Sequence, residues 1–381
     1  MPSIPAAQPT RVLLVCSGLD HASRGFESFA RECFVALRDE PALDLRLIKG
    51  SGPPDDRERS VPTLRRDGNI ARAFGRIFGK EPFRFEQLAF ALSLQPLLIS
   101  RPPEVVYFSE WHTGIGLSLL RRITRQRFRL VLCNGTSAAE GFKHLDLVQE
   151  LTPAALDTVL ERGADPTRQT MLPLGFTIEP SLELPSPEDR QALRRRLNLP
   201  VDRPIVLSVA ALNRQKRIDY LIEELGRMPE PRPFLLLVGQ AEAETADLRA
   251  LASRRLGDDG HSVRSVPQPE VSDLYRASDA FVLASLGEAF GRVLIEAMAH
   301  GLPCLAHDYA ITRFVLGPYG HLADLTQPGA LQQLIVTSLA GAEDHRRAHE
   351  RHRFAYETFG WERLRPRYVQ MLSGARTSPV S

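Results

Sequence analysis

Glu288 and Glu296 combine a residue type and a spacing that suit the binding of hydroxyl groups. They lie eight positions apart in the segment 285–303, which reads S-L-G-E-A-F-G-R-V-L-I-E-A-M-A-H-G-L-P. An apolar run at 280–284 predicts a buried strand before this segment, and apolar residues at helical spacing predict a helix over 290–300. Glu288 is therefore expected in a loop at a helix N-terminus, and Glu296 inside the helix.

The start of this expected helix offers groups for both anions and hydroxyls. The backbone amides of Ala289, Phe290 and Gly291 would be free there, and free amides at a helix N-terminus favour an anion such as phosphate. Ionised carboxylates only accept hydrogen bonds, so Glu288 could bind sugar hydroxyls and Glu296 the vicinal hydroxyls of a ribose. A simpler interpretation is that Glu288 and Glu296 are two unrelated surface residues. The number of other residues in the segment 285–303 that fit the same pattern disfavours this interpretation.

A cluster of cations follows another expected strand, at 204–211. Arg214, Lys216 and Arg217 lie in the loop between this strand and the next expected helix. Cations beside a helix N-terminus favour phosphate, because their charge adds to that of the helix dipole. We therefore predict a phosphate site in this loop, with an ordinary basic helix start as the alternative.

Polar residues also follow expected strands in the first half of the chain. A strand near the N-terminus is followed by Gly25 and Glu27, and the strand expected at 104–109 is followed by Glu110 and His112. Ligands of doubly wound sheets bind at the carboxyl ends of the strands. His112 is the better candidate and Glu110 the second, with a structural histidine as an equal alternative. The first loop does not fit G-x-G-x-x-G, which argues against a dinucleotide dehydrogenase.

The bulk properties are those of a globular protein of two domains. The chain has 381 residues, of which 43% are hydrophobic and 25% are charged, and its net charge of +2 gives no reason to expect a nucleic-acid partner. No apolar run is long enough to span a membrane, and the first residues lack the features of a secretory signal. We expect a cytoplasmic protein with reduced thiols and no metal-ligand spacing at its cysteines, which are Cys16, Cys33, Cys133 and Cys304.

The stretch 65–85 interleaves cations with aromatic residues: Arg65, Arg66, Arg72, Arg76, Lys80 and Arg84 with Phe74, Phe78, Phe83 and Phe85. Such a stretch could make peripheral contact with an anionic membrane, here the inner face, although a solvated arginine-rich surface is favoured. The polar, proline-rich residues 50–68 before it predict a flexible loop.

The segment around Glu288 and Glu296 resembles the E-x7-E signature of the retaining glycosyltransferases of family 4, which belong to the glycosyl transferases group 1. The resemblance implies an α/β protein of the GT-B fold, with two doubly wound, Rossmann-like domains facing a cleft. Residues 1–180 would form the acceptor-side domain, 181–203 a linker, 204–357 the nucleotide-sugar-binding domain, and 358–381 a helix crossing back to the first domain.

The resemblance also implies roles for the residues above. The donor-binding residues would be Arg214, Lys216, Glu288, Ala289, Phe290, Gly291 and Glu296. The acceptor side would include Gly25, Glu27, Glu110 and His112. The catalytic residues would be Glu288, His112 and Lys216. Two positions depart from the family pattern: Ala211 replaces an arginine of the phosphate loop, and the Asn134-Gly135 turn replaces a His-Asp-like pair.

The implied function is the transfer of a sugar from a nucleotide-diphosphate sugar to a hydroxyl group of a glycan, a lipid-linked acceptor or a small molecule. The family implies retention by a front-face route, without a metal or a bound cofactor. A non-catalytic partner of another transferase and a nucleotide-sugar epimerase are the alternatives. No residue pattern specifies the sugar, the base, the acceptor or the oligomeric state.

Overall fold

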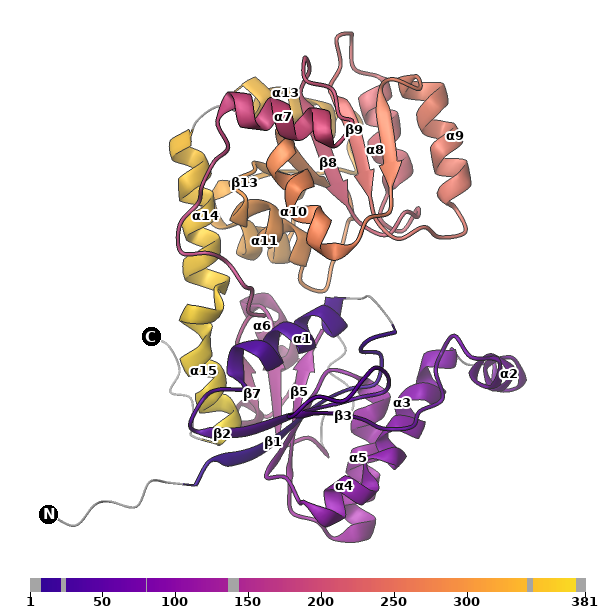
Figure 1. Ribbon diagram of the computed structural model, residues 1–381, viewed down its shortest axis with the longest axis vertical. Helices are drawn as coiled ribbons and strands as arrows, with labels where there is room; N and C mark the ends of the chain where they lie inside the picture. Colours follow the sequence, from indigo (N-terminus) through magenta and orange to yellow (C-terminus); the bar gives the residue numbers. More distant parts are fainter. Residues whose placement is uncertain (1–7, 22–24, 80, 136–143, 341–344, 375–381) are drawn as a thin grey trace, which may run out of the picture. The chain divides into compact units, whose positions relative to one another are not determined.

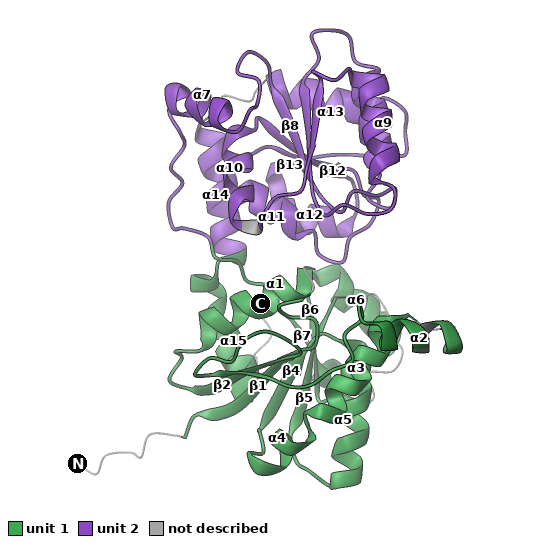
Figure 2. Ribbon diagram, turned by 45° about the vertical axis from the view of Figure 1, so that its right-hand side comes forward, with its two compact units in different colours: residues 1–177, 359–381 green, residues 178–358 purple. Residues whose placement is uncertain are grey.

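The computed structural model describes five stretches of the chain, namely residues 8–21, 25–79, 81–135, 144–340 and 345–374. The chain divides into two compact units, drawn in green and purple in Figure 2. Unit 1 consists of residues 1–177 and 359–381, and unit 2 consists of residues 178–358. The first and last parts of the chain therefore belong to the same unit.

Unit 1 contains a seven-stranded sheet in the order β3-β2-β1-β4-β5-β6-β7, in which all neighbours are parallel. Most of its strands are runs of Val, Leu, Ile and aromatic residues, as expected where both faces of a sheet are covered. The strands are β1 (Thr10–Cys16), β2 (Leu43–Lys49), β3 (Glu58–Ser60), β4 (Val105–Phe108), β5 (Arg129–Asn134), β6 (Leu147–Glu150) and β7 (Gln169–Met171).

Helices cover both faces of this sheet (Figure 1). Helices α3, α4 and α5 pack on one face through Phe90, Leu98 and Leu117, and α1 and α15 cover the other face. The helices of unit 1 are α1 (Gly25–Leu37), α2 (Asn69–Phe78), α3 (Pro82–Ser93), α4 (Gln95–Ser100), α5 (Trp111–Thr124), α6 (Pro153–Glu161) and α15 (Trp361–Ser373), with a 3₁₀ turn at Pro166–Arg168.

A buried chain of hydrogen bonds connects α15 to the sheet. Tyr107 donates to Oε1 of Gln149 at 2.5 Å, and Nε2 of Gln149 donates to the hydroxyl oxygen of Tyr368 at 2.9 Å. The Tyr368 hydroxyl in turn donates to the backbone oxygen of Pro173 at 2.8 Å. Because all three side chains are buried, these bonds satisfy polar groups that would otherwise destabilise the core.

The prediction of a flexible loop over 50–68 was wrong for β3, which lies within it. Glu58 of this strand accepts a 2.8 Å hydrogen bond from the buried Nζ of Lys49 and a 2.5 Å bond from Arg31. A strand of three polar residues has no hydrophobic period to detect. Its place in the sheet depends on pairing with β2 and on these ion pairs.

Unit 2 contains a second parallel sheet, of six strands in the order β10-β9-β8-β11-β12-β13. Its strands are β8 (Ile205–Val209), β9 (Phe234–Val238), β10 (His261–Arg264), β11 (Ala280–Leu283), β12 (Cys304–His307) and β13 (Gly320–Ala323). In both sheets a central pair of strands, β1 with β4 and β8 with β11, marks the point where the strand order reverses. Both units therefore have the predicted doubly wound topology.

The helices of unit 2 are α7 (Pro187–Arg196), α8 (Ile218–Gly226), α9 (Thr245–Leu256), α10 (Gln268–Ala277), α11 (Arg292–Ala299), α12 (Ala310–Leu316), α13 (Ala330–Ala340) and α14 (His345–Phe359), with a 3₁₀ turn at Gly317–Tyr319. Leu221 and Leu225 of α8 and Leu248 of α9 are buried in one core with β8 and β9. α7 lies within the stretch expected as a linker, and Arg190 and Arg194 bind Asp279 at 2.7 and 2.6 Å.

Replacing Gly175 with alanine tests how α15 is held in unit 1. A Cβ atom at Gly175 would lie 2.5 Å from Cδ2 and Cε2 of Trp361, the buried first residue of α15. We expect Gly175→Ala to reduce the free energy of unfolding by about 1–3 kcal/mol through overpacking, seen as a lower thermal midpoint. Gly287→Ala is the control, because its Cβ would contact nothing within 4 Å. Equal midpoints for the two variants would contradict this packing.

Candidate functional site

An ion pair bridges the point of strand reversal in unit 2. Lys216 lies in the loop after β8 and Glu288 in the loop after β11, and these strands are neighbours. Nζ of Lys216 donates to the two carboxylate oxygens of Glu288 at 2.7 and 2.9 Å. The side chains are 27% and 15% exposed, so the pair is accessible without being fully solvated. The structure thus brings together two of the residues predicted to bind the donor.

The loop that carries Lys216 is held by its own side chains. The side-chain oxygen Oδ1 of Asn213 accepts from the Lys216 backbone amide at 2.9 Å, and the side-chain Nδ2 of Asn213 donates to Glu242 at 2.8 Å. The backbone amide of Arg214 donates to Glu244 at 2.7 Å. An asparagine that caps a turn in this way is a recognisable local signal, which the sequence analysis did not use.

The other two cations of this loop differ in their accessibility. Arg214 is exposed, and its guanidinium has no ion-pair partner among the described residues. Arg217 instead lies over the ring of Tyr220, at 3.9 Å from the ring centre, and donates to the backbone oxygen of Leu325 at 3.0 Å. Arg217 is thereby engaged within its own unit, while the guanidinium of Arg214 is exposed to solvent.

Helix α11 starts at Arg292, two residues later than predicted. Gly291 adopts the left-handed conformation, with φ of 76°, and is the residue that caps the helix. Phe290 is 3% exposed, so its apolar side chain belongs to the core and not to the first helical turn. Helical spacing alone could not distinguish a buried residue of the preceding loop from a residue of the first helical turn. The amides of Ala289 and Phe290 therefore belong to the loop that leads into α11.

Glu296 is held in place from two sides. The Tyr275 hydroxyl donates to Oε2 of Glu296 at 3.1 Å, and Arg292 lies one helical turn away at 4.0 Å from Oε1. Burial and the nearby charge of Glu296 raise the pKa of Tyr275 well above its ordinary value, so the phenol remains a hydrogen-bond donor. The carboxylate of Glu296 is thus fixed, with 20% of the side chain exposed.

Two further polar groups of this region were not predicted from the sequence. The hydroxyl of Ser285 is buried without a hydrogen-bond partner among the residues that the structure describes. Burial and the charge of Glu288 raise the pKa of Tyr309 to about 12, which keeps that phenol neutral. Neither residue stands out in the sequence. Ser285 is a residue type common in loops, and Tyr309 lies after the next strand, β12.

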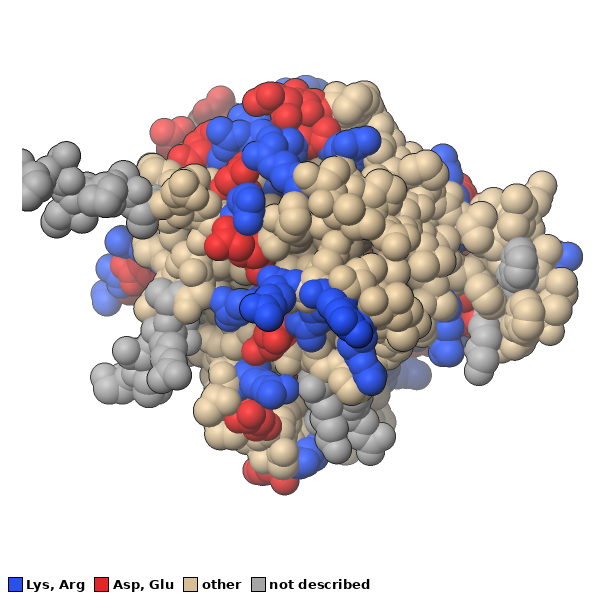
Figure 3. Space-filling view, turned by 90° about the horizontal axis from the view of Figure 1, so that it is seen from below, with Lys and Arg blue, Asp and Glu red and all other residues tan. Residues whose placement is uncertain are grey.

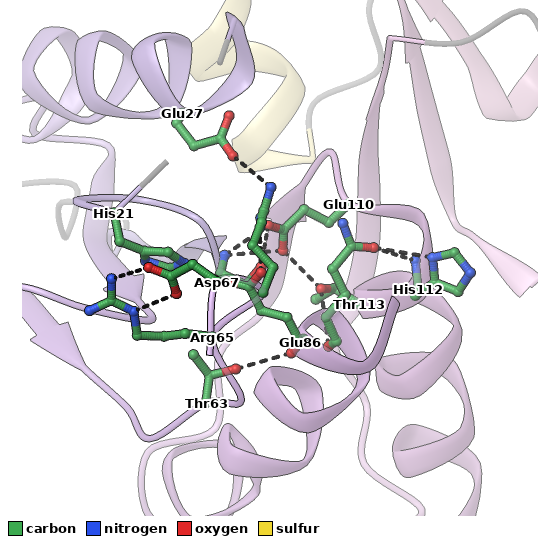
Figure 4. A network of polar contacts seen from close by, with 12 residues as sticks. His21, Glu27, Thr63, Arg65, Asp67, Glu86, Glu110, His112 and Thr113 are labelled. Atoms are coloured by element: carbon green, nitrogen blue, oxygen red, sulfur yellow. Dashed lines mark hydrogen bonds and ion pairs between the residues drawn. The ribbon is translucent and has the colours of Figure 1, made fainter. Parts of the chain in front are cut away.

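Unit 1 carries a buried polar network at its own strand reversal, between β1 and β4 (Figure 4). Glu110 accepts from the backbone amide and the hydroxyl of Ser17 at 2.9 and 2.6 Å, and from the Thr113 hydroxyl at 2.9 Å. Burial, together with the charge of Glu27, raises the pKa of Glu110 despite these bonds. Glu110 therefore joins the loop after β1 to the start of α5.

His112 is oriented by Gln87 of α3. The Oε1 atom of Gln87 accepts from the backbone amide of His112 at 3.1 Å and lies 3.2 Å from its Nδ1. Because an amide oxygen only accepts, Nδ1 carries the proton in the neutral ring and Nε2 is left as an acceptor. Burial and the charge of Arg84 lower the pKa of His112. The ring is therefore a neutral acceptor suited to a hydroxyl group.

Arg66 and Glu86 complete this network, and the sequence analysis placed Arg66 only in a basic stretch. Glu86 is buried, binds Arg66, and lies 2.6 Å from Nε2 of His21. Burial opposes ionisation of Glu86, but these two partners outweigh it and lower its pKa. Arg66 also lies 3.7 Å from Glu27, in the first turn of the helix that Gly25 begins. Glu27 of the predicted acceptor side thus lies beside an arginine that sequence spacing did not reveal.

A second buried carboxyl group lies at the end of β6. Glu150 accepts from the side-chain amide of Asn134 with both oxygens, at 2.9 Å each. Burial raises the pKa of Glu150 to about 7, although the Asn134 bond opposes the shift. Asn134 was noted only as a departure from the family pattern, and its partner was not foreseen because β5 and β6 meet only in the folded sheet.

The described part of the chain has neither a cluster of metal-binding side chains nor a membrane-spanning helix. No group of three or more His, Cys, Asp or Glu side chains is arranged to hold a metal ion there. No helix there has the length and apolar character needed to cross a membrane. The four cysteines are buried and form no disulfide. Lys80 of the expected membrane-contacting stretch lies outside the described residues.

Residues 189–354 match the family model described as glycosyl transferases group 1. The chain is 34% identical over 226 residues to a D-inositol 3-phosphate glycosyltransferase of Xylanimonas cellulosilytica, which covers 57% of this chain and 54% of that protein. It is 29% identical over 256 residues to the mannosylfructose-phosphate synthase of Agrobacterium fabrum. This match covers 63% of this chain and 55% of that protein. The chain thus spans about half the length of these curated relatives.

Solved structures show the same fold over nearly the whole chain. The sucrose-phosphate synthase of Thermosynechococcus elongatus aligns with a TM-score of 0.75 and 19% identity, covering 95% of this chain and 98% of that one. Anabaena HepE, solved in complex with UDP and glucose, aligns with a TM-score of 0.73 and 17% identity. The alignment covers 96% of this chain and 100% of HepE. The chain has the GT-B fold, as predicted.

Glu150 should make stability depend on pH. Its pKa is about 7 in the folded chain against an ordinary 4.5, so the folded state binds the proton more tightly. The resulting stabilisation is complete below the ordinary pKa and is lost as pH rises through the folded value. Between about pH 5 and about pH 8, we expect the Glu150→Gln variant to gain about 2–3 kcal/mol over wild type in urea unfolding.

The exposed Glu161→Gln variant on α6 is the control for this comparison, and its stability relative to wild type should not change with pH. Parallel pH profiles for wild type and Glu150→Gln would show that the carboxyl group is not perturbed by burial.

Proposed function

We propose that this chain, whose residues 189–354 match the family model of the glycosyl transferases group 1, is a glycosyltransferase that uses a nucleotide-diphosphate sugar. One observation carries the proposal: Lys216 and Glu288 meet across the strand reversal of unit 2. Glu296, fixed by Tyr275, follows Glu288 at the spacing of the E-x7-E signature. The names of the relatives and the nucleotide in the HepE structure support the same activity.

The donor would bind by exchanging partners with the Lys216–Glu288 ion pair. The ammonium of Lys216 and the free guanidinium of Arg214 would bind the diphosphate, together with the loop amides of Ala289, Phe290 and Gly291. Glu288, released from Lys216, would accept from hydroxyls of the sugar. Glu296 would accept from the ribose, since an ionised carboxylate accepts from two vicinal hydroxyls at once.

The transfer would proceed with retention. The bond between the sugar C1 and the diphosphate oxygen breaks as the acceptor oxygen bonds to C1 on the same face, and the acceptor proton passes to the departing phosphate. Lys216 and Arg214 would stabilise the charge that develops on the leaving group, which is the role of preorganised cations. We propose that no metal and no bound cofactor take part.

The acceptor side would be the network of unit 1. His112, neutral and with Nε2 free to accept, would position a hydroxyl group of the substrates. Glu27 and Arg66 would present a charge pair to a polar acceptor near the start of α1, at Gly25. Glu110, whose oxygens already bind Ser17 and Thr113, would hold the loop after β1 in position.

Titration with nucleoside diphosphates tests the donor site. We expect one of UDP, GDP, ADP and TDP to raise the thermal midpoint of the wild-type protein by about 5 °C at saturating concentration. Lys216→Met and Glu296→Gln should lose most of this shift, measured against each variant's own unliganded midpoint. The exposed Arg249→Met and Glu188→Gln variants of unit 2 should keep the full shift.

Two outcomes of the titration would contradict the proposal. If no diphosphate stabilises the protein, the chain is better described as a non-catalytic partner of another transferase. If Lys216→Met and Glu296→Gln respond like the controls, the nucleotide binds elsewhere.

The stereochemistry and metal dependence of transfer can be tested together. We expect proton NMR to show the same anomeric configuration in product and donor, with D-inositol 3-phosphate and simple methyl glycosides as first acceptors. The rate should be unchanged by a chelator, because fixed cations replace a metal at the leaving group. Inversion, or a rate that depends on added Mg²⁺, would contradict the proposed mechanism.

A further inference from the structure

Exposed apolar side chains are concentrated in one part of unit 1. Fifteen large hydrophobic residues are exposed among the described residues, and ten of them lie between positions 70 and 123. Scattered exposed hydrophobics are normal on a soluble protein, but a contiguous patch marks an interaction site. The distribution therefore calls for a partner that covers this part of the surface.

One stripe of α5 accounts for four of these residues. Trp111, Ile115, Leu119 and Ile123 are spaced four apart and so lie along one side of the helix. Their exposure rises from 37% and 46% to 57% and 68% along the helix. At the helical rise per residue the stripe is about 18 Å long. An amphipathic helix normally buries such a stripe, whereas α5 buries a different one that includes Leu117 and Leu120.

Helix α3 extends this apolar surface on one flank of α5. Gly116 lets the two helices approach closely, since a Cβ there would lie 2.6 Å from Cβ of Ala91 and 3.9 Å from Leu88. Leu88 and Leu92 are themselves 37% and 61% exposed. Because Leu88 lies against Gly116, these leucines adjoin the stripe between Ile115 and Leu119.

A small apolar pocket lies on the other flank of α5. It has a volume of about 220 Å³, and its walls include Phe108, Trp111, Leu119 and Leu145, with Arg122 at the same site. The pocket is thus also lined by three residues of the exposed stripe, Trp111, Ile115 and Leu119. The surface can therefore accept apolar groups that penetrate below it.

The stretches of chain that form this surface carry arginines and no acidic residue. Residues 87–103 and 111–129 contain no aspartate or glutamate. Arg122, Arg125 and Arg127 are exposed and have no ion-pair partner among the described residues. The view in Figure 3 shows a broad uncharged area with both basic and acidic side chains beside it. An apolar surface bordered by unpaired arginines complements a layer with an apolar interior and an anionic surface.

The stretch 65–85, where membrane contact was predicted, is in part directed inward. Arg66 binds the buried Glu86, and Arg65 pairs with Asp67 at 2.7 Å. Exposed apolar residues of this stretch remain on α2, at Ile70, Ile77 and Phe78. The exposed apolar side chains of α3 and α5 are therefore better placed to form a contact surface than the cations of 65–85.

We propose that the outer surface of α3 and α5, defined by Leu88, Leu92, Trp111, Ile115, Leu119 and Ile123, docks onto a membrane that contains anionic lipids. The apolar side chains enter the interface between headgroups and acyl chains, and Trp111 suits that interface because its ring is apolar with one polar group. Arg122, Arg125 and Arg127 attract the anionic headgroups. His112 directly follows Trp111, so the predicted acceptor side begins next to the docked surface.

Co-sedimentation with vesicles tests this proposal on the full chain. We expect wild type to bind vesicles of phosphatidylcholine and phosphatidylglycerol, in a ratio of about three to one, at least about tenfold better than vesicles of phosphatidylcholine alone, and to lose binding as salt rises. The double variant Leu119→Gln, Ile123→Gln should bind about tenfold more weakly, because two apolar groups no longer enter the interface.

Charge variants separate the electrostatic part of binding. Each arginine removed should weaken binding about fivefold, so Arg122→Gln with Arg127→Gln should bind about twenty-five-fold more weakly to the anionic vesicles. Val336→Gln, at an exposed apolar position of α13, is the control for the apolar variant. Arg249→Gln with Arg254→Gln, two exposed arginines of α9, is the control for the charge variant.

Three results would overturn the proposal. The first is no binding of wild type to anionic vesicles. The second is an equal loss of binding in the control variants, which would show non-specific attraction. The third is a concentration-dependent dimer, seen by analytical ultracentrifugation, that Leu119→Gln with Ile123→Gln abolishes, since a second copy of the chain would then cover this surface.

Discussion

The reversal of strand order in each sheet is the constraint on which both candidate sites depend. A doubly wound sheet reverses once, and the loops that follow the two central strands diverge there. In unit 2 the side chains that meet at this point are Lys216 and Glu288, and in unit 1 they are Ser17 and Glu110. The same topology thus produces an accessible ion pair, Lys216–Glu288, in unit 2. In unit 1 it produces a buried hydrogen bond from the Ser17 hydroxyl to the Glu110 carboxyl group.

Because they differ in burial, the Ser17–Glu110 contact and the Lys216–Glu288 contact are suited to different roles. A buried carboxylate with all its hydrogen bonds made, such as Glu110, costs much to disturb and serves to hold loops together. The Lys216–Glu288 pair keeps a quarter of the lysine side chain in solvent, so its partners can be exchanged for those of a ligand at a small cost in desolvation. A site that binds a dianion and then releases it benefits from such a pair, because neither charge is left unpaired in the empty state.

Helix α5 connects the chemistry of unit 1 with its surface. Its first turn carries His112, oriented by Gln87, while its outer side exposes the stripe from Trp111 to Ile123. Its buried side packs on the sheet, and Gly116 brings α3 close enough to continue the exposed surface. One helix can therefore serve the fold, the candidate acceptor side and the docking surface, because each uses a different side of the helix.

The sequence by itself determined what depends on short-range patterns. Apolar runs predicted β4, β8 and β11, and the spacing of Glu288 and Glu296 predicted the signature loop and helix. The tertiary structure alone decided which loops meet. The Lys216–Glu288 pair and the place of Arg66 on Glu86 join residues 72 and 20 positions apart. Such contacts depend on strand order and burial, which no local spacing encodes.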